Sequence, residues 1–473
     1  MRPLRPEAKS AALMADLLVD DPYTLAETVR LPLAGEAEAG RALDAARAAA
    51  RLWAYSPIAE RMALCLRAME IMESEKEEIA ADITRMMGKP LKQARGEVGG
   101  MAKRARYMVS IAEAALADTV LPALAGFERR IARAPLGVVF CLPAWNYPLL
   151  TAVNVVVPAI LAGNSVLLKH SPRSPLCGER FARAFAKAGA PAGLLQALHC
   201  DHATSEKIAG DPRVDFVAFT GSVYGGHRIY AAAASARFID VGLELGGKDA
   251  AYLAEDADIE KAVDGIVDGA CYNAGQSCCA VERAYVHRSI YDRVVELALA
   301  QMKAYKLGDP RDEATNLGPI AQAWHPAFIQ KQIDQAVKNG ARVLTGGKAI
   351  SVDERGRFFE PTLLVDVAPA LDVMRLETFG PVLPIVAVDS DEEALARIND
   401  SDLGLTASVW TKDRDRAAHL AARIETGTVY MNQCDTLDPA LPWTGVKDSG
   451  KGATLSALGF QHLTRPKALN FKL

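Results

Sequence analysis

A stretch without a single charged residue runs from Pro135 to Leu168, and it constrains the fold strongly. A membrane-spanning helix needs about 20 consecutive apolar residues. Prolines and asparagines interrupt this stretch, so no apolar run of that length survives: Pro143, Asn146, Pro148, Asn154, Pro158 and Asn164. We therefore expect a soluble protein with no membrane association, and we place the stretch in a buried core.

The uncharged stretch predicts a β-α-β unit. Leu136–Leu142 is typical of a buried strand, and Val166–Lys169 of the next one. Between them, Pro148 suits the first turn of a helix that runs to Ala162. Strands buried on both faces of a parallel sheet are continuously apolar, as these two are.

Helices precede this unit, and similar alternating units follow it. Residues 36–116 predict three long helices, with a stop signal at Met86–Pro90 between the second and the third. Beyond residue 169, helices and strands alternate up to a strand that ends at Glu244, and a second alternating series follows residue 280. This order predicts an open α/β sheet in each part. Residues 127–134 and the alternating end of the chain predict two exposed strands that pair with each other.

The segment Asn273–Ala280 is a candidate for the chemistry. It follows a predicted amphipathic helix, about residues 258–273, and Gly275 breaks that helix before Cys278. A thiolate is a strong nucleophile, and a glycine turn can present it to a cleft. Glu244, followed by Gly246 and Gly247, supplies a candidate general base. The alternative is that Cys278 and Cys279 are small core residues, since free cysteine is often buried.

A second candidate is Gly221–Gly226, which lies between a predicted strand and a predicted helix. Backbone N–H groups at the start of a helix can cradle a phosphate. The glycine spacing is not that of the Gly-x-Gly-x-x-Gly dinucleotide fingerprint, so an ordinary strand–helix turn remains the alternative.

Composition narrows the function classes. A length of 473 residues is typical of about three domains, and the net charge of −4 provides no basic field for nucleic acid or anionic lipid. The cysteines lack paired metal-ligand spacing, so we expect no metal site and a reducing, cytoplasmic location. The N-terminal residues Met1–Pro6 do not open a signal peptide. The eight cysteines are at positions 65, 141, 177, 200, 271, 278, 279 and 434.

Taken together, the motifs resemble the aldehyde dehydrogenase superfamily, non-acylating branch, over nearly the whole chain. Their order and separations fit that superfamily. The motifs are Pro143-Ala144-Trp145-Asn146-Tyr147-Pro148, Phe219-Thr220-Gly221-Ser222, Glu244-Leu245-Gly246-Gly247-Lys248, Gly275-Gln276-Ser277-Cys278, Glu377-Thr378-Phe379-Gly380-Pro381 and Gly445-Val446-Lys447-Asp448-Ser449-Gly450.

The resemblance implies NAD(P)-dependent oxidation of an aldehyde to its carboxylic acid. Cys278 would attack the aldehyde carbon, and Asn146 would donate to the oxyanion, an interaction worth about 3–4 kcal/mol. The thiohemiacetal would lose hydride to give a thioester, which Glu244 would help to hydrolyse. Cys279 would be a packing neighbour. The alternatives are a succinate-semialdehyde-type dehydrogenase, a coenzyme A-acylating enzyme (whose members generally lack the base), a thioester hydrolase that uses the same pair, and a non-catalytic protein with this fold.

The resemblance also implies a cofactor site and a substrate tunnel. The implied cofactor-binding residues are Trp145, Lys169, Gly221, Ser222, Gly226, Glu377 and Phe379. The implied tunnel residues are Tyr147, Tyr272 and Trp443, with Asn154 in place of a large apolar residue. Pro172 stands where NAD-preferring members often carry a glutamate, and Arg173 adds a guanidinium, so we expect NAD or NADP to bind. No arginine is predicted in the tunnel, which weighs against succinate semialdehyde.

The implied fold class is α/β, with a Rossmann-like cofactor domain, a second α/β catalytic domain and a small β oligomerisation extension. Residues 1–120 and 136–246 would form the dinucleotide-binding domain, and residues 247–446 the catalytic domain. Residues 121–135 and 447–473 would form the oligomerisation strands of a homodimer or homotetramer. The only other partner we expect is a small-molecule aldehyde.

Overall fold

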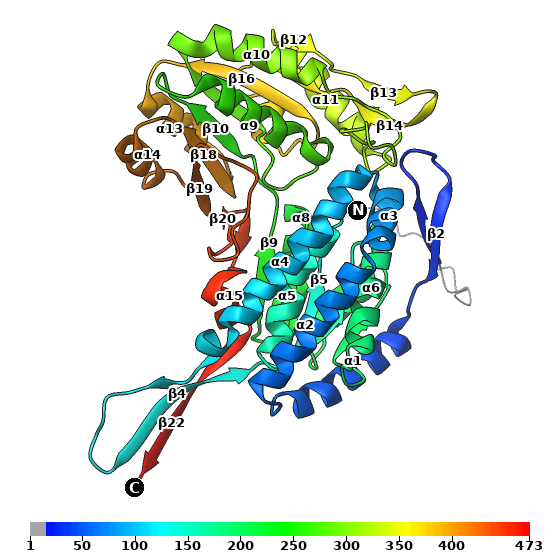
Figure 1. The fold of residues 1–473 in the computed structure, drawn as a ribbon, viewed down its shortest axis with the longest axis vertical. Helices are drawn as coiled ribbons and strands as arrows, with labels where there is room; N and C mark the ends of the chain where they lie inside the picture. Colours follow the sequence, from blue (N-terminus) through cyan, green and yellow to red (C-terminus); the bar gives the residue numbers. More distant parts are fainter. Residues whose placement is uncertain (1–15) are drawn as a thin grey trace, which may run out of the picture.

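The computed structural model describes residues 16–473, which form a mixed α/β molecule with two large β-sheets and a smaller projecting sheet (Figure 1). The stretch Met1–Pro6, which we did not expect to open a signal peptide, lies outside these residues. The first described element is a hairpin of β1 (Asp16–Asp20) and β2 (Glu27–Pro32), which the sequence did not predict. None of the helices in residues 16–473 combines the length and the apolar character that crossing a membrane requires.

A six-stranded sheet contains the uncharged stretch. Its order is β21-β9-β8-β5-β6-β7, and every pair is parallel except β21 against β9. The predicted β-α-β unit is confirmed, because β5 and β6 pair in parallel and α5 (Pro148–Leu161) connects them. The strands are β5 (Val138–Leu142), β6 (Ser165–Leu168), β7 (Leu195–Ala197), β8 (Phe216–Thr220), β9 (Asp240–Glu244) and β21 (Gly450–Lys451).

Helices cover both faces of this sheet, which explains why β5 carries no charge. Val139 and Cys141 point to a core shared with α2, α4, α5 and α6, whereas Val138 and Phe140 point to a core shared with α1, α7 and α8. The helices are α1 (Glu36–Trp53), α2 (Ile58–Ser74), α3 (Lys76–Met87), α4 (Leu91–Leu116), α6 (Pro175–Lys187), α7 (His202–Ala209), α8 (Val223–Ala236) and α15 (Ser456–His462).

The prediction of three helices over residues 36–116 is wrong, because this region contains four. The unpredicted break lies at Glu75, between α2 and α3. Its carboxylate pairs with Arg180 at 3.1 Å and Lys187 at 2.8 Å, both on α6. Since neither proline nor glycine marks the break, local sequence could not reveal it. The predicted stop at Met86–Pro90 is confirmed, with Gly88 in the left-handed region at φ 78°.

A seven-stranded sheet follows, in the order β12-β15-β16-β11-β10-β18-β19, with all pairs parallel except β12 against β15. Its strands are β10 (Ala250–Leu253), β11 (Arg283–His287), β12 (Arg342–Thr345), β15 (Thr362–Val365), β16 (Val382–Val388), β18 (Thr406–Trp410) and β19 (Thr428–Met431). The alternating series that the sequence predicted after residue 280 is confirmed, and β10, which precedes that residue, belongs to the same sheet. The accompanying helices are α9 (Ile259–Cys271), α10 (Tyr291–Lys303), α11 (His325–Lys338), α12 (Asp372–Arg375), α13 (Asp391–Asn399) and α14 (Arg414–Ala421).

Three small strand groups complete the fold. β13 (Ala349–Val352) pairs with β14 (Arg355–Phe359), and β17 (Leu403–Gly404) pairs with β20 (Val446–Lys447). A three-stranded sheet projects from the molecule and contains β3 (Thr119–Val120), β4 (Phe127–Pro135) and β22 (Thr464–Lys472).

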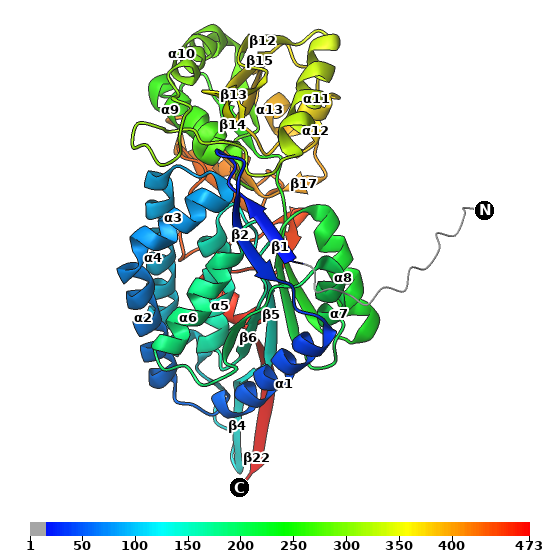
Figure 2. The same cartoon turned by 90° about the vertical axis from the view of Figure 1, so that its right-hand side faces the viewer.

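The predicted pairing of the exposed strand with the chain end is confirmed. β22 runs antiparallel to β4 along its whole length, from Thr464 opposite Pro135 to Lys472 opposite Phe127. Figure 2 shows the two strands side by side beyond the body of the molecule, with the C-terminus at the tip. The segment before β22 is not all strand, because α15 lies there and packs on α4 and α5.

Candidate active site

The Cys278 segment is positioned by a left-handed turn. After α9, Asn273, Ala274 and Gly275 have φ values of 54°, 56° and 69°. A Cβ at Gly275 would collide with the backbone of Gly380, so glycine is required by both the conformation and the close approach. The predicted glycine break therefore also brings the cysteine segment against the 377–381 loop.

Buried amide side chains hold this turn. Asn273 Nδ2 donates to the Gln276 carbonyl at 3.1 Å, and Gln276 Nε2 donates to the Asn273 carbonyl at 3.0 Å. Gln276 Oε1 accepts from the Ala321 backbone N–H at 2.8 Å. These bonds fix the backbone that precedes Cys278, whose side chain is partly exposed.

The Asn146 loop is tied to the same turn. The Asn146 carbonyl accepts from Asn273 Nδ2 at 3.2 Å and from Lys89 Nζ at 2.8 Å. Lys89 is fully buried and also forms an ion pair with Glu97, which accepts from the Leu149 backbone N–H at 2.8 Å. Sequence reasoning missed Lys89 and Glu97. A lysine between Gly88 and Pro90 in an otherwise apolar stop signal was the available clue.

Glu244 is the last residue of β9 and lies beside the thiol segment. Its carboxylate accepts hydrogen bonds from Thr220 Oγ1 at 3.2 Å and from Thr454 Oγ1. Burial raises the pKa of Glu244, and these hydroxyls and the Arg104 guanidinium partly oppose the rise. A Cβ at Gly247 would lie 2.7 Å from the Cys278 carbonyl oxygen, so this glycine permits the Glu244 turn to approach the cysteine.

Two cavities meet at this point. The smaller has a volume of about 660 Å³ and the larger about 900 Å³. Cys278 and Glu244 line both of them. Asn146 lines the larger cavity, and all three predicted tunnel residues line the smaller one: Tyr147, Tyr272 and Trp443. The structure thus brings the three predicted catalytic residues together, although they come from distant parts of the chain.

The larger cavity contains the predicted phosphate turn. Gly221, Ser222 and Gly225 line it, and Ser222 caps the start of α8 by accepting from the Gly225 N–H at 3.1 Å. Gly226, which we expected to frame this turn, does not line the cavity. A Cβ there would lie 2.8 Å from Leu245 Cδ2, so Gly226 permits α8 to pack on Leu245 instead.

Lys169 lines the larger cavity at the end of β6. It is buried, which lowers its pKa, and its Nζ has no hydrogen-bond partner within residues 16–473.

Arg173 also lines this cavity, but its guanidinium is not free as the sequence suggested, because it forms an ion pair with Asp20 of β1. Burial would raise the pKa of Asp20, but the hydrogen bonds from Arg357 and Arg173 outweigh it and leave the pKa at about 2.

The loop at residues 377–381 lines part of the larger cavity. Glu282 accepts from the backbone N–H groups of Thr378 and Phe379, each at 2.8 Å, and Lys248 Nζ donates to Glu282 at 2.5 Å. This buried pair presents Glu377 and the Phe379 ring, and both line the cavity. Burial, together with the Glu282 charge, raises the pKa of Glu377 to about 8. Sequence reasoning did not identify Glu282, which lies outside the recognised motifs.

Trp145 completes this wall. Its ring lies edge-on to the Phe379 ring, with the two ring centres 5.5 Å apart, and it lines the larger cavity. All the predicted cofactor residues except Gly226 therefore surround one cavity.

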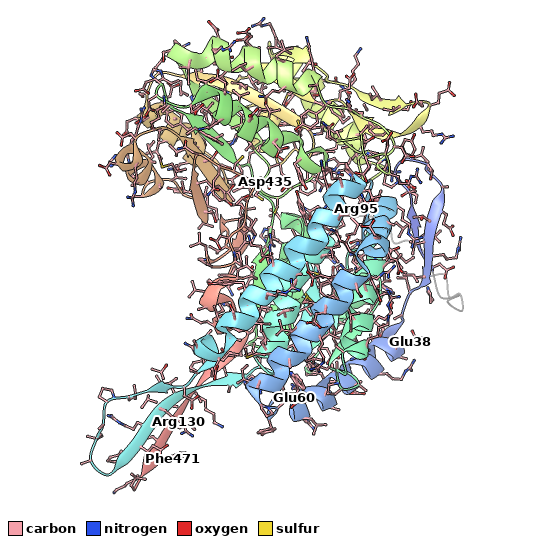
Figure 3. All side chains as sticks on the ribbon, in the orientation of Figure 1. Glu38, Glu60, Arg95, Arg130, Asp435 and Phe471 are labelled. Carbon is pink, nitrogen blue, oxygen red and sulfur yellow. The ribbon has the colours of Figure 1, made fainter. Side chains whose placement is uncertain are left out.

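Cys279 is buried beside the nucleophile candidate. Its Sγ donates to Asp435 Oδ1 at 2.9 Å, and Ser277 Oγ donates to the same atom at 3.0 Å. The hydrogen bond with Cys278, then burial, raise the pKa of Cys279, and burial raises that of Asp435 to about 6. Figure 3 shows Asp435 where the upper and lower halves of the molecule meet.

The prediction that no arginine lies in the tunnel is wrong. Arg104, on α4, lines the smaller cavity and donates to Asn154 Oδ1 at 3.2 Å. The helical pattern of residues 36–116 suggested only a cover for the sheet, so it did not show which face of α4 meets the cavity.

Within residues 16–473, no cluster of three or more histidine, cysteine, aspartate or glutamate side chains is arranged to hold a metal ion.

Known proteins share this chain's sequence and fold. The model of the aldehyde dehydrogenase family matches residues 10–469. Succinate-semialdehyde dehydrogenase [NADP(+)] of Deinococcus radiodurans is 35% identical over 448 residues, which cover 94% of this chain and 93% of that protein. Succinate semialdehyde dehydrogenase [NAD(P)+] of Escherichia coli K12 is 36% identical, over 93% of this chain and 94% of the relative.

A solved structure has the same fold. Indole-3-acetaldehyde dehydrogenase in complex with NAD+ superposes with a TM-score of 0.95 and 32% identity, over 99% of this chain and 95% of that one. The fold, with its two cavities around a thiol and a carboxylate, is that of an enzyme. The chain belongs to the aldehyde dehydrogenase family.

The site predicts selective alkylation. Six of the eight cysteines are buried, and Cys434, which is partly exposed, has a pKa raised to about 12, chiefly by burial. Iodoacetamide at pH 7.5 should therefore label Cys278 first, with one label per chain, as measured by peptide mass spectrometry. The Cys278→Ser variant should lose this rapid label. Rapid labelling of another cysteine in the wild type would contradict the geometry.

Proposed function

We propose that this protein oxidises an aldehyde to the carboxylic acid with NAD or NADP as hydride acceptor, through a thioester on Cys278. The observation that carries the proposal is that Cys278 and Glu244 line both cavities. An aldehyde in the smaller cavity and a dinucleotide in the larger one would then meet at the same sulfur.

Attack by the Cys278 thiolate forms a C–S bond, and the carbonyl electron pair moves to oxygen as a thiohemiacetal oxyanion. The donors proposed for this oxygen are the Asn146 side-chain amide and the Cys278 backbone N–H. In the part of the chain that the structure describes, neither donates to another protein group, so both are available to the substrate. A preorganised donor of this kind is worth about 3–4 kcal/mol in the transition state.

The larger cavity suits a dinucleotide. Backbone N–H groups at the start of α8 suit a phosphate, and Glu377 offers a carboxyl group to a ribose hydroxyl. Lys169 offers an ammonium group that has no hydrogen-bond partner within residues 16–473. Bound NAD or NADP supplies the hydride acceptor that oxidation of the thiohemiacetal requires. The chain's own residues would orient the two reactants at the junction of the cavities.

Glu244 is the proposed base for hydrolysis. It would take a proton from the water that attacks the thioester, and the acid and the Cys278 thiol would be released. The two threonine hydroxyls orient its carboxylate, and burial raises its pKa toward the working range of a general base. This base favours free acid as the product over transfer to coenzyme A.

The cofactor proposal covers both dinucleotides. Pro172 provides no carboxylate to repel a 2′-phosphate. The two relatives named above carry the designations NADP(+) and NAD(P)+, and the solved neighbour is in complex with NAD+. The pairing of Arg173 with Asp20 reduces its pull on a phosphate, so we propose Lys169 as the main cation for this part of the cofactor.

We propose a division of labour within the chain. Residues 1–120 and 136–246 would bind the dinucleotide, residues 247–446 would carry the cysteine, and residues 121–135 and 447–473 would serve assembly. Eight free cysteines support a reducing compartment, the cytoplasm.

A Glu244→Gln variant tests the mechanism. The glutamine can hydrogen-bond but cannot accept the water proton, so thioester hydrolysis should slow by about 10²–10⁴-fold. Oxidation in the first turnover should persist, as a burst of about one reduced nicotinamide per site followed by a slow steady state. In the wild type, the steady-state rate should fall as pH drops through the raised pKa of Glu244. The variant should not show this decrease at low pH.

The measurement is stopped-flow absorbance at 340 nm with an aldehyde panel and either dinucleotide, together with product analysis without coenzyme A. Glu392→Gln, which removes an exposed carboxylate that pairs with Arg423, is the matched control and should behave as wild type. Undiminished turnover in Glu244→Gln would exclude it as the base.

The projecting sheet predicts a homodimer or homotetramer. β22 is its outer strand and pairs on one side only within residues 16–473, so its other edge is open to a second copy. Figure 3 shows Arg130 on β4 and the half-exposed Phe471 on β22, well away from the body. Light scattering should give a mass of two or four times the 50.7 kDa chain, and a monomer would contradict assembly through this sheet.

A further inference from the structure

Arg104 is a positive charge without an acidic partner in the smaller cavity. No aspartate or glutamate within residues 16–473 lies within 4.0 Å of its guanidinium, and its one hydrogen bond is to Asn154. A guanidinium carries five N–H donors, so most of its donor capacity is left for a ligand. The remaining cation of the cavity lining, Lys261, is largely exposed and pairs with Asp258 at 3.1 Å.

The position of Arg104 makes an unpaired charge costly. Burial lowers its pKa, and the charges of nearby groups oppose this effect, Glu244 first. A guanidinium still remains charged at neutral pH. A partly buried charge without a counter-ion is unfavourable, and a bidentate carboxylate would compensate it.

The carboxylates that line this cavity already have other partners or lie at its exposed rim. Glu97 pairs with Lys89, Glu244 binds two threonines and Asp435 binds Ser277 and Cys279. Asp264 and Asp268 are exposed on α9. The counter-ion missing at Arg104 is therefore not supplied by the cavity wall.

We propose that Arg104 binds a carboxylate at the end of the substrate remote from the aldehyde, so that the enzyme prefers carboxylated aldehydes. The proposal rests on the proposed function and names its substrate class. Apolar and aromatic side chains line the space that the rest of the substrate would occupy: Leu150, Tyr272, Trp410, Leu437 and Trp443. An arginine without an acidic partner in the described chain, beside an apolar wall, suits a carboxylate on a short hydrocarbon spacer.

Arg104 could instead act only on Glu244, by favouring its ionised form. Such a role would affect every aldehyde equally, whereas recognition of a carboxylate would affect only substrates that carry one. The comparison of two aldehydes of equal chain length therefore separates the two roles.

The test measures kcat/KM for succinic semialdehyde and for butanal, which has the same number of carbons and no carboxylate. The wild type should favour succinic semialdehyde, and Arg104→Met should reduce the ratio of the two kcat/KM values on the order of 100-fold, mainly through KM. Arg104→Lys keeps the charge but lacks the planar guanidinium, so its ratio of kcat/KM values should lie between those of the wild type and Arg104→Met. Arg106→Met, on the exposed face of the same helix where Arg106 pairs with Glu73, is the matched control and should keep the wild-type ratio.

Equal losses for both aldehydes in Arg104→Met, or no preference in the wild type, would overturn the inference while aldehyde oxidation stands. If neither aldehyde is oxidised by the wild type, the proposed function itself is in question, and binding decides the inference. Calorimetry would then compare succinamate with butanamide, in which an unreactive amide replaces the aldehyde. Tighter binding of succinamate that is lost in Arg104→Met supports the role of Arg104, and equal binding of both amides overturns it.

Discussion

The carbonyl oxygen of Asn146 is the point at which the site is assembled. It accepts from Asn273, in the turn before Cys278, and from Lys89, at the junction of α3 and α4. Three segments far apart in the sequence are therefore fixed by one backbone atom. Lys89 is fully buried, and removing its partners would leave an uncompensated charge, which proteins tolerate poorly. This network orients the Asn146 loop toward the cysteine before any substrate arrives.

Close backbone approaches complete the junction of the two cavities. Gly275 allows the cysteine turn to lie on the 377–381 loop, and Gly247 allows the Glu244 turn to lie on Cys278. The reacting groups are thus held by glycines and buried hydrogen bonds, while the walls of the smaller cavity come from side chains on separate helices and loops. Such walls can vary without disturbing the thiol and the carboxylate, so the chemistry and the choice of aldehyde are set by different residues. Arg104 belongs to the second group.

The sequence predicted much of this arrangement, because its strongest signals are local. The apolar strands around α5, the glycine break before Cys278 and the carboxylate at the end of β9 all follow from neighbouring residues. Lys89, Glu282 and Arg104 escaped prediction, since their roles depend on tertiary contacts. The rotation of α4 about its axis, for example, decides whether Arg104 or Arg106 faces the cavity, and both lie on a continuous helical pattern. The prediction that Gly226 frames the phosphate turn failed for a similar reason. The residue that packs against it, Leu245, follows a different strand in the sequence.

The proposed mechanism depends on covalent chemistry at the Cys278 sulfur, and the most direct measurement is aldehyde-dependent formation of reduced nicotinamide by Cys278→Ala. We expect kcat/KM to fall by at least about 1,000-fold, because the carbonyl carbon then has no nucleophile to bind. Cys65→Ala, which removes a buried thiol of α2, should retain turnover at temperatures where it stays folded. Undiminished turnover in a folded Cys278→Ala protein would contradict the account.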